Sequence, residues 1–575
     1  TIFNSDTNEI SCSDLNGNFS MTIKNIDSEI NFFLEGFNLL TKLYSPVTED
    51  LKNIEIRLIP KIEELNEVVV RANLKKIFQI KRMEDVEGTR IFAGKKNEVI
   101  LIDVSMANLA SNNARQIYNQ IPGLNIYQND DAGLQLNIGG RGLNPNRTAN
   151  FNTRQNNYDI SADALGYPES YYTPPPEGLD EIQILRGAAS LQYGTQFGGL
   201  INFKIKEPKT DDKFELITRN TAGSNNLFTN FTSISSSSNK SSYYGYVNYK
   251  KGDGFRPNSE FESINTFQNF NYDLNEKSKI TGEITYMEYL AHQAGGLSDF
   301  MFANDPFQSN RERNWFEIKW FLYNLKYLLE ISENSSFSFS FFGLDAKRNS
   351  LGFRTNRVDQ IDYGEERDLI KGDFKNFGFE SRYLTNHSFF NTKSYLLLGV
   401  KYYNSYSQSV QGPGSSSKDA NFNFDYVNFP NYVNQSEYNY PNNNLAIFGE
   451  NIFYIDEKLS ITPGFRFENI STSLDGFYRK INLDAAGNTI YNERFDEKDT
   501  KKRKFLLLGL GLSYKNQGFE IYTNFSQNFR SVTFADISII NPAYAINPSI
   551  DDEKGFTFDL GFRGNYKKIV SFDSS

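Results

Sequence analysis

Arginine side chains stand in two long polar stretches in the second half of the chain. Arg311 and Arg313 lie at the end of the first stretch, and Arg348, Arg354 and Arg357 lie at or within the second. A guanidinium group can hold a carboxylate through two parallel hydrogen bonds, so these residues are candidates for binding an anionic ligand. The alternative for each of them is an ordinary surface role, in which the side chain is solvated or paired with a nearby acid.

Residues for covalent or metal chemistry are scarce. The chain has two histidines, His292 and His387, and one cysteine, Cys12. These counts exclude a disulfide framework within the chain and a zinc site built on cysteines. No nucleophile–histidine–acid set or paired-carboxylate site stands out, so we expect neither enzyme activity nor a bound metal or cofactor. The net charge of −10 argues against a general nucleic-acid binder.

Strands with two different faces must position any binding site in this half of the chain. From residue 212 to residue 575 apolar residues repeat with a period of two. In one strand Leu506, Leu508 and Leu510 share a face, and Gly509 and Ser513 share the other. A transmembrane β-barrel needs this alternation, because its exterior is apolar and its interior is aqueous. The mean hydropathy is only −0.54, and no apolar run reaches the roughly 18 residues that a transmembrane helix needs.

The links between these strands alternate in length, as they do in outer-membrane barrels, which have short turns at one rim and long loops at the other. We expect about fifteen antiparallel strands with every long link at one rim. The predicted short links are 237–240, 275–278, 332–334, 456–458, 515–517 and 565–568, and the predicted long links are 252–262, 290–313, 347–371, 408–443, 473–500 and 531–554.

Residues 85–208 show a mixed α and β pattern. A helix is expected from an N-cap at Ser111 to Gln120, because residues 114, 117, 118 and 121 follow the spacing of one buried face. Pro122 and Gly123 end it. Strands are expected at 124–127, 134–138, 181–185 and 200–206, with a short helix near 188–193.

Residues 1–62 resemble a small β-domain, with strands expected at 18–23, 30–33 and 54–59 and a turn at Asp14–Asn18. A linker at 63–84 follows and contains three consecutive valines, Val68, Val69 and Val70. These valines could form the last strand of the N-terminal domain, or they could be a segment that adds to the sheet of another protein.

Several ordered motifs resemble one family. Residues 181–194 and 198–203, together with 116–126 and 138–142, resemble the plug domain of TonB-dependent outer-membrane receptors. Residues 13–20 resemble the carboxypeptidase-regulatory-like domain that precedes the plug in Bacteroidetes receptors, and 65–70 resemble the TonB box of that group. Residues 529–536 and 561–564 resemble the receptor barrel, although Ser531-Val532 departs from its usual sequence. Within the family, 158–160 and 166–170 are most similar to ferric dicitrate receptors.

The resemblance implies a fold and a set of site residues. The fold is mainly β: a transmembrane antiparallel β-barrel, an internal α/β plug and a small N-terminal β-sandwich. It implies a TonB box at Glu67, Val68, Val69 and Val70. It places ligand-binding residues at the apex of the plug and in the long loops, where the candidates are Arg147, Arg154, Tyr167, Arg311, Arg313, Arg348, Arg354 and Arg357. It gives the plug a structural motif made of Gly139, Gly140, Arg141, Gly142, Arg186, Gly187, Gly194, Gly198 and Gly199.

The resemblance also implies active import of a ferric chelate, with TonB and its inner-membrane energising complex as partners. The expected setting is the outer membrane of a Gram-negative bacterium, in contact with lipopolysaccharide, and the expected state is a monomer. Receptor barrels of this family have about 22 strands and end on an aromatic residue, whereas this chain shows about fifteen and ends at Ser575. We therefore expect truncation at the C-terminus and at the N-terminus. The alternatives are import of haem, cobalamin or a glycan, or a passive porin or adhesin.

Overall fold

The computed structural model comprises two compact units, Thr1–Lys75 and Lys76–Ser575. It describes the whole chain except residues 8, 15, 24–26, 35–36, 38, 45–53, 59–80, 106, 129, 131, 141, 187–189, 195, 210–213, 356, 390–391, 534–548 and 567–569. The predicted TonB box, Glu67 to Val70, and two residues of the predicted plug motif, Arg141 and Gly187, lie outside the described residues.

The N-terminal unit is built on one antiparallel sheet. Its strands are β1 (Ile2–Asn4), β2 (Ile10–Ser11), β3 (Ser28–Phe32) and β4 (Leu40–Tyr44), in the order β2-β1-β3-β4. The predictions of strands at 18–23 and 54–59 are wrong for the described residues: alternate side chains of these segments pack on the sheet, but their backbones do not pair. These two segments form a second layer over the sheet without backbone hydrogen-bond pairing. The predicted turn is confirmed, with Gly17 at φ +84° and the Asp14 carboxylate accepting from the backbone of Asn16 and Asn18.

The second unit is dominated by a sheet of fifteen strands, each paired antiparallel with the next, which confirms the predicted number. The strands are β14 (Phe214–Ala222), β15 (Phe228–Ser237), β16 (Ser241–Gly252), β17 (Phe261–Asn275), β18 (Ser278–His292), β19 (Trp315–Ser332), β20 (Ser335–Gly352), β21 (Arg367–Phe389), β22 (Thr392–Gly414), β23 (Ser436–Tyr454), β24 (Leu459–Leu483), β25 (Thr489–Asn516), β26 (Phe519–Arg530), β27 (Glu553–Tyr566) and β28 (Val570–Ser574). Within the described residues, β14 and β28 form the two edges and do not pair with each other.

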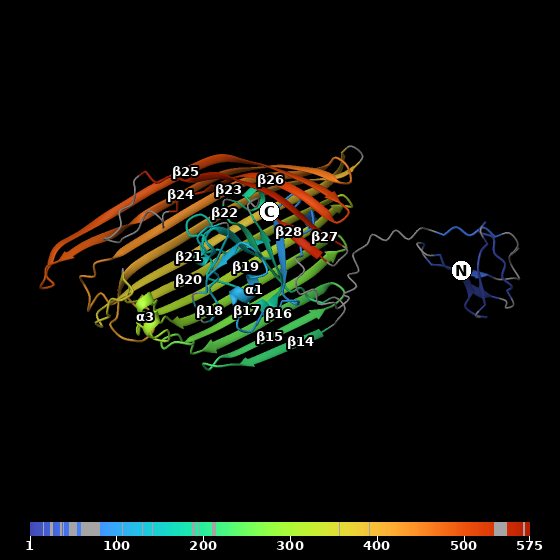
Figure 1. Ribbon diagram of the computed structural model, residues 1–575. Helices are drawn as coiled ribbons and strands as arrows, with labels where there is room; N and C mark the ends of the chain where they lie inside the picture. Colours follow the sequence, from blue (N-terminus) through green and yellow to red (C-terminus); the bar gives the residue numbers. More distant parts are fainter. Residues whose placement is uncertain are drawn as a thin grey trace. The chain divides into compact units, whose positions relative to one another are not determined.

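The two faces of the large sheet differ as the alternation predicts. Leu506, Leu508 and Leu510 are exposed on the convex face, whereas Ser460 and Thr462 are buried on the concave face. The concave face curves around the plug (Figure 1), and side chains of both form a shared core. Among the described helices, none combines the length and the apolar character needed to cross a bilayer.

The links also sort by rim. One rim carries short turns, such as 276–277 and 333–334, and the opposite rim carries the long links 293–314, 353–366 and 415–435. We call these the short-turn rim and the long-link rim. A short helix, α3 (Asp299–Asn304), lies in the first of the long links.

One predicted long link, 473–500, is wrong, because most of it is strand. β24 and β25 continue as a hairpin and leave only 484–488 between them. Cross-strand pairs explain the extension. Asp475 binds Lys498 at 2.6 Å, and the rings of Tyr478 and Phe495 stack with centroids 5.1 Å apart. The segment was predicted as a loop because its residues are polar. The sequence does not show which of them face each other across a hairpin.

The plug is built on a five-stranded sheet in the order β11-β10-β13-β12-β7. Its strands are β7 (Asn97–Leu101), β10 (Phe151–Gln155), β11 (Tyr158–Asp159), β12 (Leu179–Leu185) and β13 (Gly199–Ile205); the hairpins β5 (Val86–Glu87) with β6 (Arg90–Ile91) and β8 (Leu124–Ile126) with β9 (Ile138–Gly140) are separate. Two α-helices, α1 (Ala114–Tyr118) and α2 (Ser190–Tyr193), and two 3-10 helices, η1 (Asn146–Thr148) and η2 (Pro176–Gly178), complete it.

Helix α1 is shorter than predicted. Its N-cap is Asn113, whose side chain accepts a hydrogen bond from the backbone N–H of Gln116 at 3.2 Å. The predicted cap, Ser111, donates its hydroxyl to the backbone of Asn108 instead. Asn112 between them has φ +54°, a left-handed conformation that a helix cannot include. The strand predicted at 134–138 is also displaced, to Ile138–Gly140.

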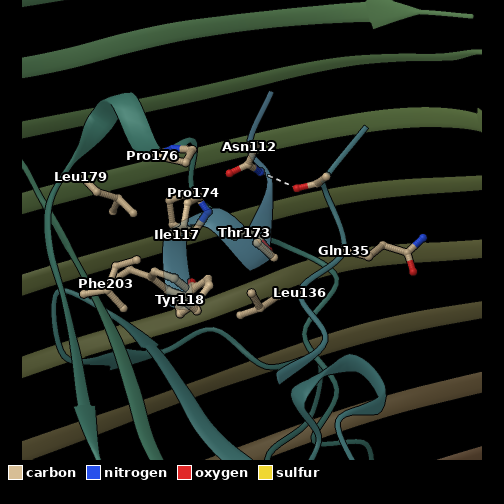
Figure 2. A pocket seen from close by; sticks show the side chains of 13 residues that line it. Asn112, Ile117, Tyr118, Gln135, Leu136, Thr173, Pro174, Pro176, Leu179 and Phe203 are labelled. Atoms are coloured by element: carbon tan, nitrogen blue, oxygen red, sulfur yellow. Dashed lines mark hydrogen bonds between the residues drawn. The ribbon is translucent and has the colours of Figure 1, made fainter. Parts of the chain in front are cut away.

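Figure 2 shows the cavity in the plug core where α1 faces β12 and β13. Its lining includes Tyr118, Leu136, Leu179 and Phe203, and Asn112 donates its side-chain N–H to the backbone oxygen of Gly133. The cavity volume is about 10 Å³, which is at the lower limit for a single water molecule. The interior of the plug is therefore a packed core and holds no ligand-sized space at this point.

Two glycines of the predicted plug motif are required by close backbone approach. A Cβ at Gly139 would lie 2.3 Å from the backbone oxygen of Leu143, and Gly199 has φ +107° with the oxygen of Leu185 at 2.0 Å from its Cβ position. A side chain at either position would displace the backbone. Arg186 belongs to the same motif and donates to the backbone oxygen of Pro122 and, at 3.2 Å, to Glu98.

Candidate functional site

Buried ion pairs fill the interface between the plug and the concave face of the sheet. Lys95 of the plug binds Glu450 of β23 at 2.5 Å. Arg154 of β10 lies 3.2 Å from Glu380 of β21, which also binds Arg382 at 2.6 Å. A buried charge is stable only when it is paired and hydrogen-bonded, so these groups hold the plug against the wall.

The structure places Arg154, one of the predicted ligand residues, within this paired interface. The Arg154 residue is 1% exposed. Its guanidinium donates to Glu380 and to the backbone oxygens of Asn157 and Tyr193. The sequence places Arg154 in the plug but does not show that the side chain points into the wall.

A second set of arginines braces the long links. Arg311 donates to the backbone oxygens of Val358 and Gln360, both at 3.2 Å. Arg313 donates through Nε to Asp362 at 2.8 Å and through Nη1 to the backbone of Ser416. Arg311 and Arg313 were predicted to bind ligand, but their donors are occupied by links 353–366 and 415–435. Burial alone would raise the pKa of Asp362, but hydrogen bonds from Arg313 and the Gly364 backbone lower it.

The sequence reasoning missed Arg367, which completes the brace. Arg367 is 0% exposed. It donates to the backbone oxygens of Arg313, Ser415 and Asp419 at 3.1, 2.7 and 2.8 Å. No pattern in the sequence distinguishes Arg367 from a surface arginine, because its acceptors lie in links that meet only in the fold. Two of the predicted ligand residues, Arg354 and Arg357, remain exposed in link 353–366, and Arg357 lies 3.4 Å from Asp359.

A cavity of about 130 Å³ lies between the plug and the wall on the side of the long-link rim. Two of the predicted ligand residues, Tyr167 and Arg348, lie next to each other in its lining. The other residues that line it are Asp163, Gly166, Gly372, Phe374, Ser407, Gln408, Ser409 and Tyr440. The Tyr167 ring stacks on Phe374 with centroids 5.2 Å apart. The structure therefore brings a plug tyrosine and a wall arginine, far apart in sequence, to one opening.

Arg348 differs from the other predicted arginines in its partners. Nη2 donates to the Tyr167 hydroxyl at 3.2 Å, and the guanidinium lies 5.7 Å from the centre of the Tyr167 ring. Nε is buried without a hydrogen-bond partner. In the part of the chain that the structure describes, no carboxylate forms an ion pair with Arg348. Arg348 is half-buried, and a cation partly withdrawn from water without an anionic partner is costly, so this position can accept an anion from outside the protein.

Arg147, the third predicted plug residue, lies close to this cavity but is already paired. It binds Glu169 at 2.9 Å, and its guanidinium lies 4.9 Å from the centre of the Tyr171 ring. Its backbone has φ +47°, and its N–H donates to the side chain of Asn137 at 2.8 Å. Non-glycine residues in this conformation are uncommon and often mark functional positions.

Another cavity, of about 480 Å³, opens at the short-turn rim. Its lining includes Arg82, Lys458, Lys515, Glu520 and Arg563. Two carboxylates neutralise much of this charge, because Glu520 binds Arg563 at 2.8 Å and Asp85 binds Lys515 at 2.6 Å. This cavity lies where the first described residues of the plug meet the wall, so it is suited to the exit side of the plug.

The comparisons with known proteins agree with this architecture. A family model described as TonB dependent receptor-like, beta-barrel matches residues 258–573, and one described as TonB-dependent Receptor Plug Domain matches residues 103–200. No match was found among curated proteins.

Solved structures share the fold at low sequence identity. The unliganded ferric citrate transporter FecA is 19% identical with a TM-score of 0.66, and the comparison covers 82% of this chain and 68% of that one. The siderophore receptor PiuA from Acinetobacter baumannii is 12% identical with a TM-score of 0.64, covering 86% and 73%. The ferric yersiniabactin uptake receptor FyuA from Yersinia pestis is 13% identical with a TM-score of 0.62, covering 82% and 70%. Likeness at these identities concerns the fold.

Proposed function

The chain belongs to the TonB-dependent receptors, and from that premise we propose that it imports a ferric chelate across the outer membrane of a Gram-negative bacterium. The observation that carries the proposal is the cavity at the long-link rim, where Tyr167 of the plug and the unpaired Arg348 of the wall meet. Ferric chelates are commonly anionic, and an anion would accept hydrogen bonds from the half-buried guanidinium of Arg348.

The ligand enters from the long-link rim in this proposal. Links 293–314, 353–366 and 415–435 are braced together by arginines, so they form a fixed entrance rather than separate mobile loops. Arg354 and Arg357 are exposed on this entrance and can attract an anion before it reaches Arg348. Arg147 shapes the floor through Glu169 and Tyr171.

Energy coupling is assigned to the segment before the plug. We place the TonB box at Glu67, Val68, Val69 and Val70, where three β-branched residues suit an added strand. The first described contact of the plug beyond this segment is the bridge between Lys81 and Val99 of β7. β7 is an edge strand of the plug sheet. A pulling force transmitted through the linker would therefore act first on β7 and separate it from the neighbouring strand.

The outer wall suits a monomer surrounded by lipid. Lys502 and Lys504 are exposed on the same face as Leu506 and Leu508, one step closer to the long-link rim. Among the described residues neither lysine has an ion pair, so both can bind the phosphates of lipopolysaccharide above the apolar band.

Uptake of a radioactive ferric chelate tests the proposal in a strain whose only receptor for it is this protein. Replacing Val69 with proline removes a backbone donor from the added strand. We expect uptake by Val69→Pro cells to fall to background while binding to the cell surface is retained. The matched control is Ala72→Pro, which lies outside the proposed strand and should transport normally. Normal uptake by Val69→Pro cells would show that coupling does not use this segment, and energy-independent uptake by every strain would indicate a passive pore.

A further inference from the structure

The cavity beside Arg348 is specific enough to suggest the chemistry of the ligand. We propose that it binds one anionic aryl ring of the ferric chelate, such as a catecholate or an aryl carboxylate, and not an aliphatic carboxylate arm. This inference rests on the proposed function and narrows its substrate class.

The size of the cavity sets the first limit. Its volume is about 130 Å³, and an apolar cavity of about 150 Å³ in another protein holds a benzene ring. One six-membered ring therefore fits, but a whole chelate with several arms around an iron atom does not. The remainder of the chelate must lie outside the cavity, in the space below the braced links.

The walls favour a flat ring. Tyr167 and Phe374 stack with centroids 5.2 Å apart and an angle of 24° between their planes, and Tyr440 lines the same cavity. Aromatic rings prefer offset-stacked or edge-to-face neighbours, which an inserted ring can supply. Gly372 keeps the space open, because a Cβ there would lie 2.9 Å from the Phe374 ring and 3.7 Å from Nε of Arg348.

The charges favour an anion on that ring. The carboxylate of Asp163, the acid in the lining, is already satisfied: it accepts from Asn442 at 2.7 Å, and from Ser407 and Tyr403 at 3.2 Å. Among the described residues, the Arg348 guanidinium has the Tyr167 hydroxyl as its acceptor, and its Nε has none. A negatively charged oxygen on the ring edge would accept a charge-assisted hydrogen bond from the guanidinium of this arginine.

A ligand that carries several aliphatic carboxylates fits the site less well. Such a ligand needs several unpaired cations in one place, but two of the neighbouring arginines are already paired with acids. Arg147 binds Glu169, and Arg313 binds Asp362. In the described part of the cavity, Arg348 is the one guanidinium without a carboxylate. The single cation of Arg348 beside the stacked rings of Tyr167 and Phe374 is complementary, in charge and in shape, to one negatively charged aryl group.

Filling the cavity from the wall tests the inference. Ser409 lines the cavity on β22 and makes no side-chain hydrogen bond in the described structure, so Ser409→Phe occupies the space without removing a plug contact. The matched control is Asn404→Phe, on the same strand but on its outward face opposite the exposed Phe377. The probes are a ferric tris-catecholate and ferric citrate, and the measurement is their equilibrium binding to the intact purified receptor.

We expect the tris-catecholate to bind wild type and Asn404→Phe equally and Ser409→Phe about ten-fold or more weakly, which corresponds to about 1.4 kcal/mol. Equal binding of the tris-catecholate by wild type and Ser409→Phe would overturn the inference. If Ser409→Phe does not fold, Arg348→Gln serves instead, with the same expected loss and the same contrary result.

The outcomes also separate this inference from the proposed function. If ferric citrate alone binds, and Ser409→Phe does not weaken it, the receptor still takes a ferric chelate but the aryl inference is wrong. If neither probe binds and energised cells import neither, the proposed function fails together with the inference.

Discussion

Two regions of the plug–wall boundary use arginine in opposite ways. At the middle of the wall, Arg154 and Arg382 converge on the carboxylate of Glu380. At the long-link rim, Arg348 meets aromatic rings and a hydroxyl and forms no described ion pair. Arg154 and Arg382 are buried and Arg348 is half-buried, but this difference in burial does not by itself explain their roles. The presence of a carboxylate does: the paired arginines hold the plug, and we propose that the unpaired one binds the ligand.

The largest effect on the stability of the receptor is expected when Glu380, the carboxylate that pairs with Arg154 and Arg382, is removed. Glu380→Ala leaves Arg154 and Arg382 buried without a counter-charge, which costs about 3 to 5 kcal/mol when a buried pair is broken. We expect a lower melting temperature and faster proteolysis of the plug in detergent-solubilised receptor. The matched control is Glu317→Ala on the outer surface, where the nearest lysine is partly exposed, and it should leave both measurements unchanged. Unchanged stability of Glu380→Ala would show that these pairs do not hold the plug.

The second effect separates ligand binding from stability. Arg348→Gln keeps a polar side chain but removes the cation. Because no protein carboxylate depends on it, the melting temperature should stay within a degree or two of wild type, whereas affinity for an anionic ferric chelate should fall about ten-fold. A variant that melts early and binds normally would place Arg348 with the structural arginines.

A third, intermediate effect concerns the brace at the long-link rim. Arg367→Ala removes three hydrogen bonds to backbone oxygens of links that meet at the rim. These bonds hold the links and not the strands, so we expect faster protease cleavage within 415–435 and a several-fold weaker chelate affinity. Global melting should change little, because the strands are untouched. Cleavage at the wild-type rate would show that the links hold their positions without this residue.

The smallest effect is expected at the exposed arginines of the entrance. Arg357→Ala removes a side chain that is 73% exposed and lies 3.4 Å from Asp359. Exposed ion pairs contribute about 0 to 1 kcal/mol, so equilibrium affinity should change by about two-fold or less. The association rate should lose part of its dependence on ionic strength. A ten-fold loss of affinity would mean that ligand is held by the links and not by the cavity.

The sequence was sufficient for the large sheet and insufficient for the site. Alternation of the kind seen at Leu506 to Leu510 predicts which face meets lipid, because the period of a strand is fixed by its geometry. Link 473–500 was predicted as a loop because its polar residues gain their stability from cross-strand partners such as Asp475 and Lys498. Local sequence does not record that pairing.

The arginines show the same limit at the level of single residues. Arg154, Arg311 and Arg313 have the residue type and the position in the chain that a ligand site needs, but their acceptors come from distant segments. Tyr167 and Arg348 were predicted on equal grounds, and the structure brings them to one cavity. Distinguishing the two groups requires knowledge of their three-dimensional partners, because the sequence does not show whether other parts of the protein already accept the hydrogen bonds of a guanidinium.

The most direct measurement is the position of a bound chelate in the receptor. Crystals or frozen grids of the receptor with a gallium or iron tris-catecholate would locate the metal and its rings relative to Arg348. We predict one ring inside the cavity lined by Tyr167, Phe374 and Tyr440, with a ring oxygen within hydrogen-bond distance of the Arg348 guanidinium. A chelate held by Arg354 and Arg357 in the links, with the cavity beside Arg348 empty, would contradict it.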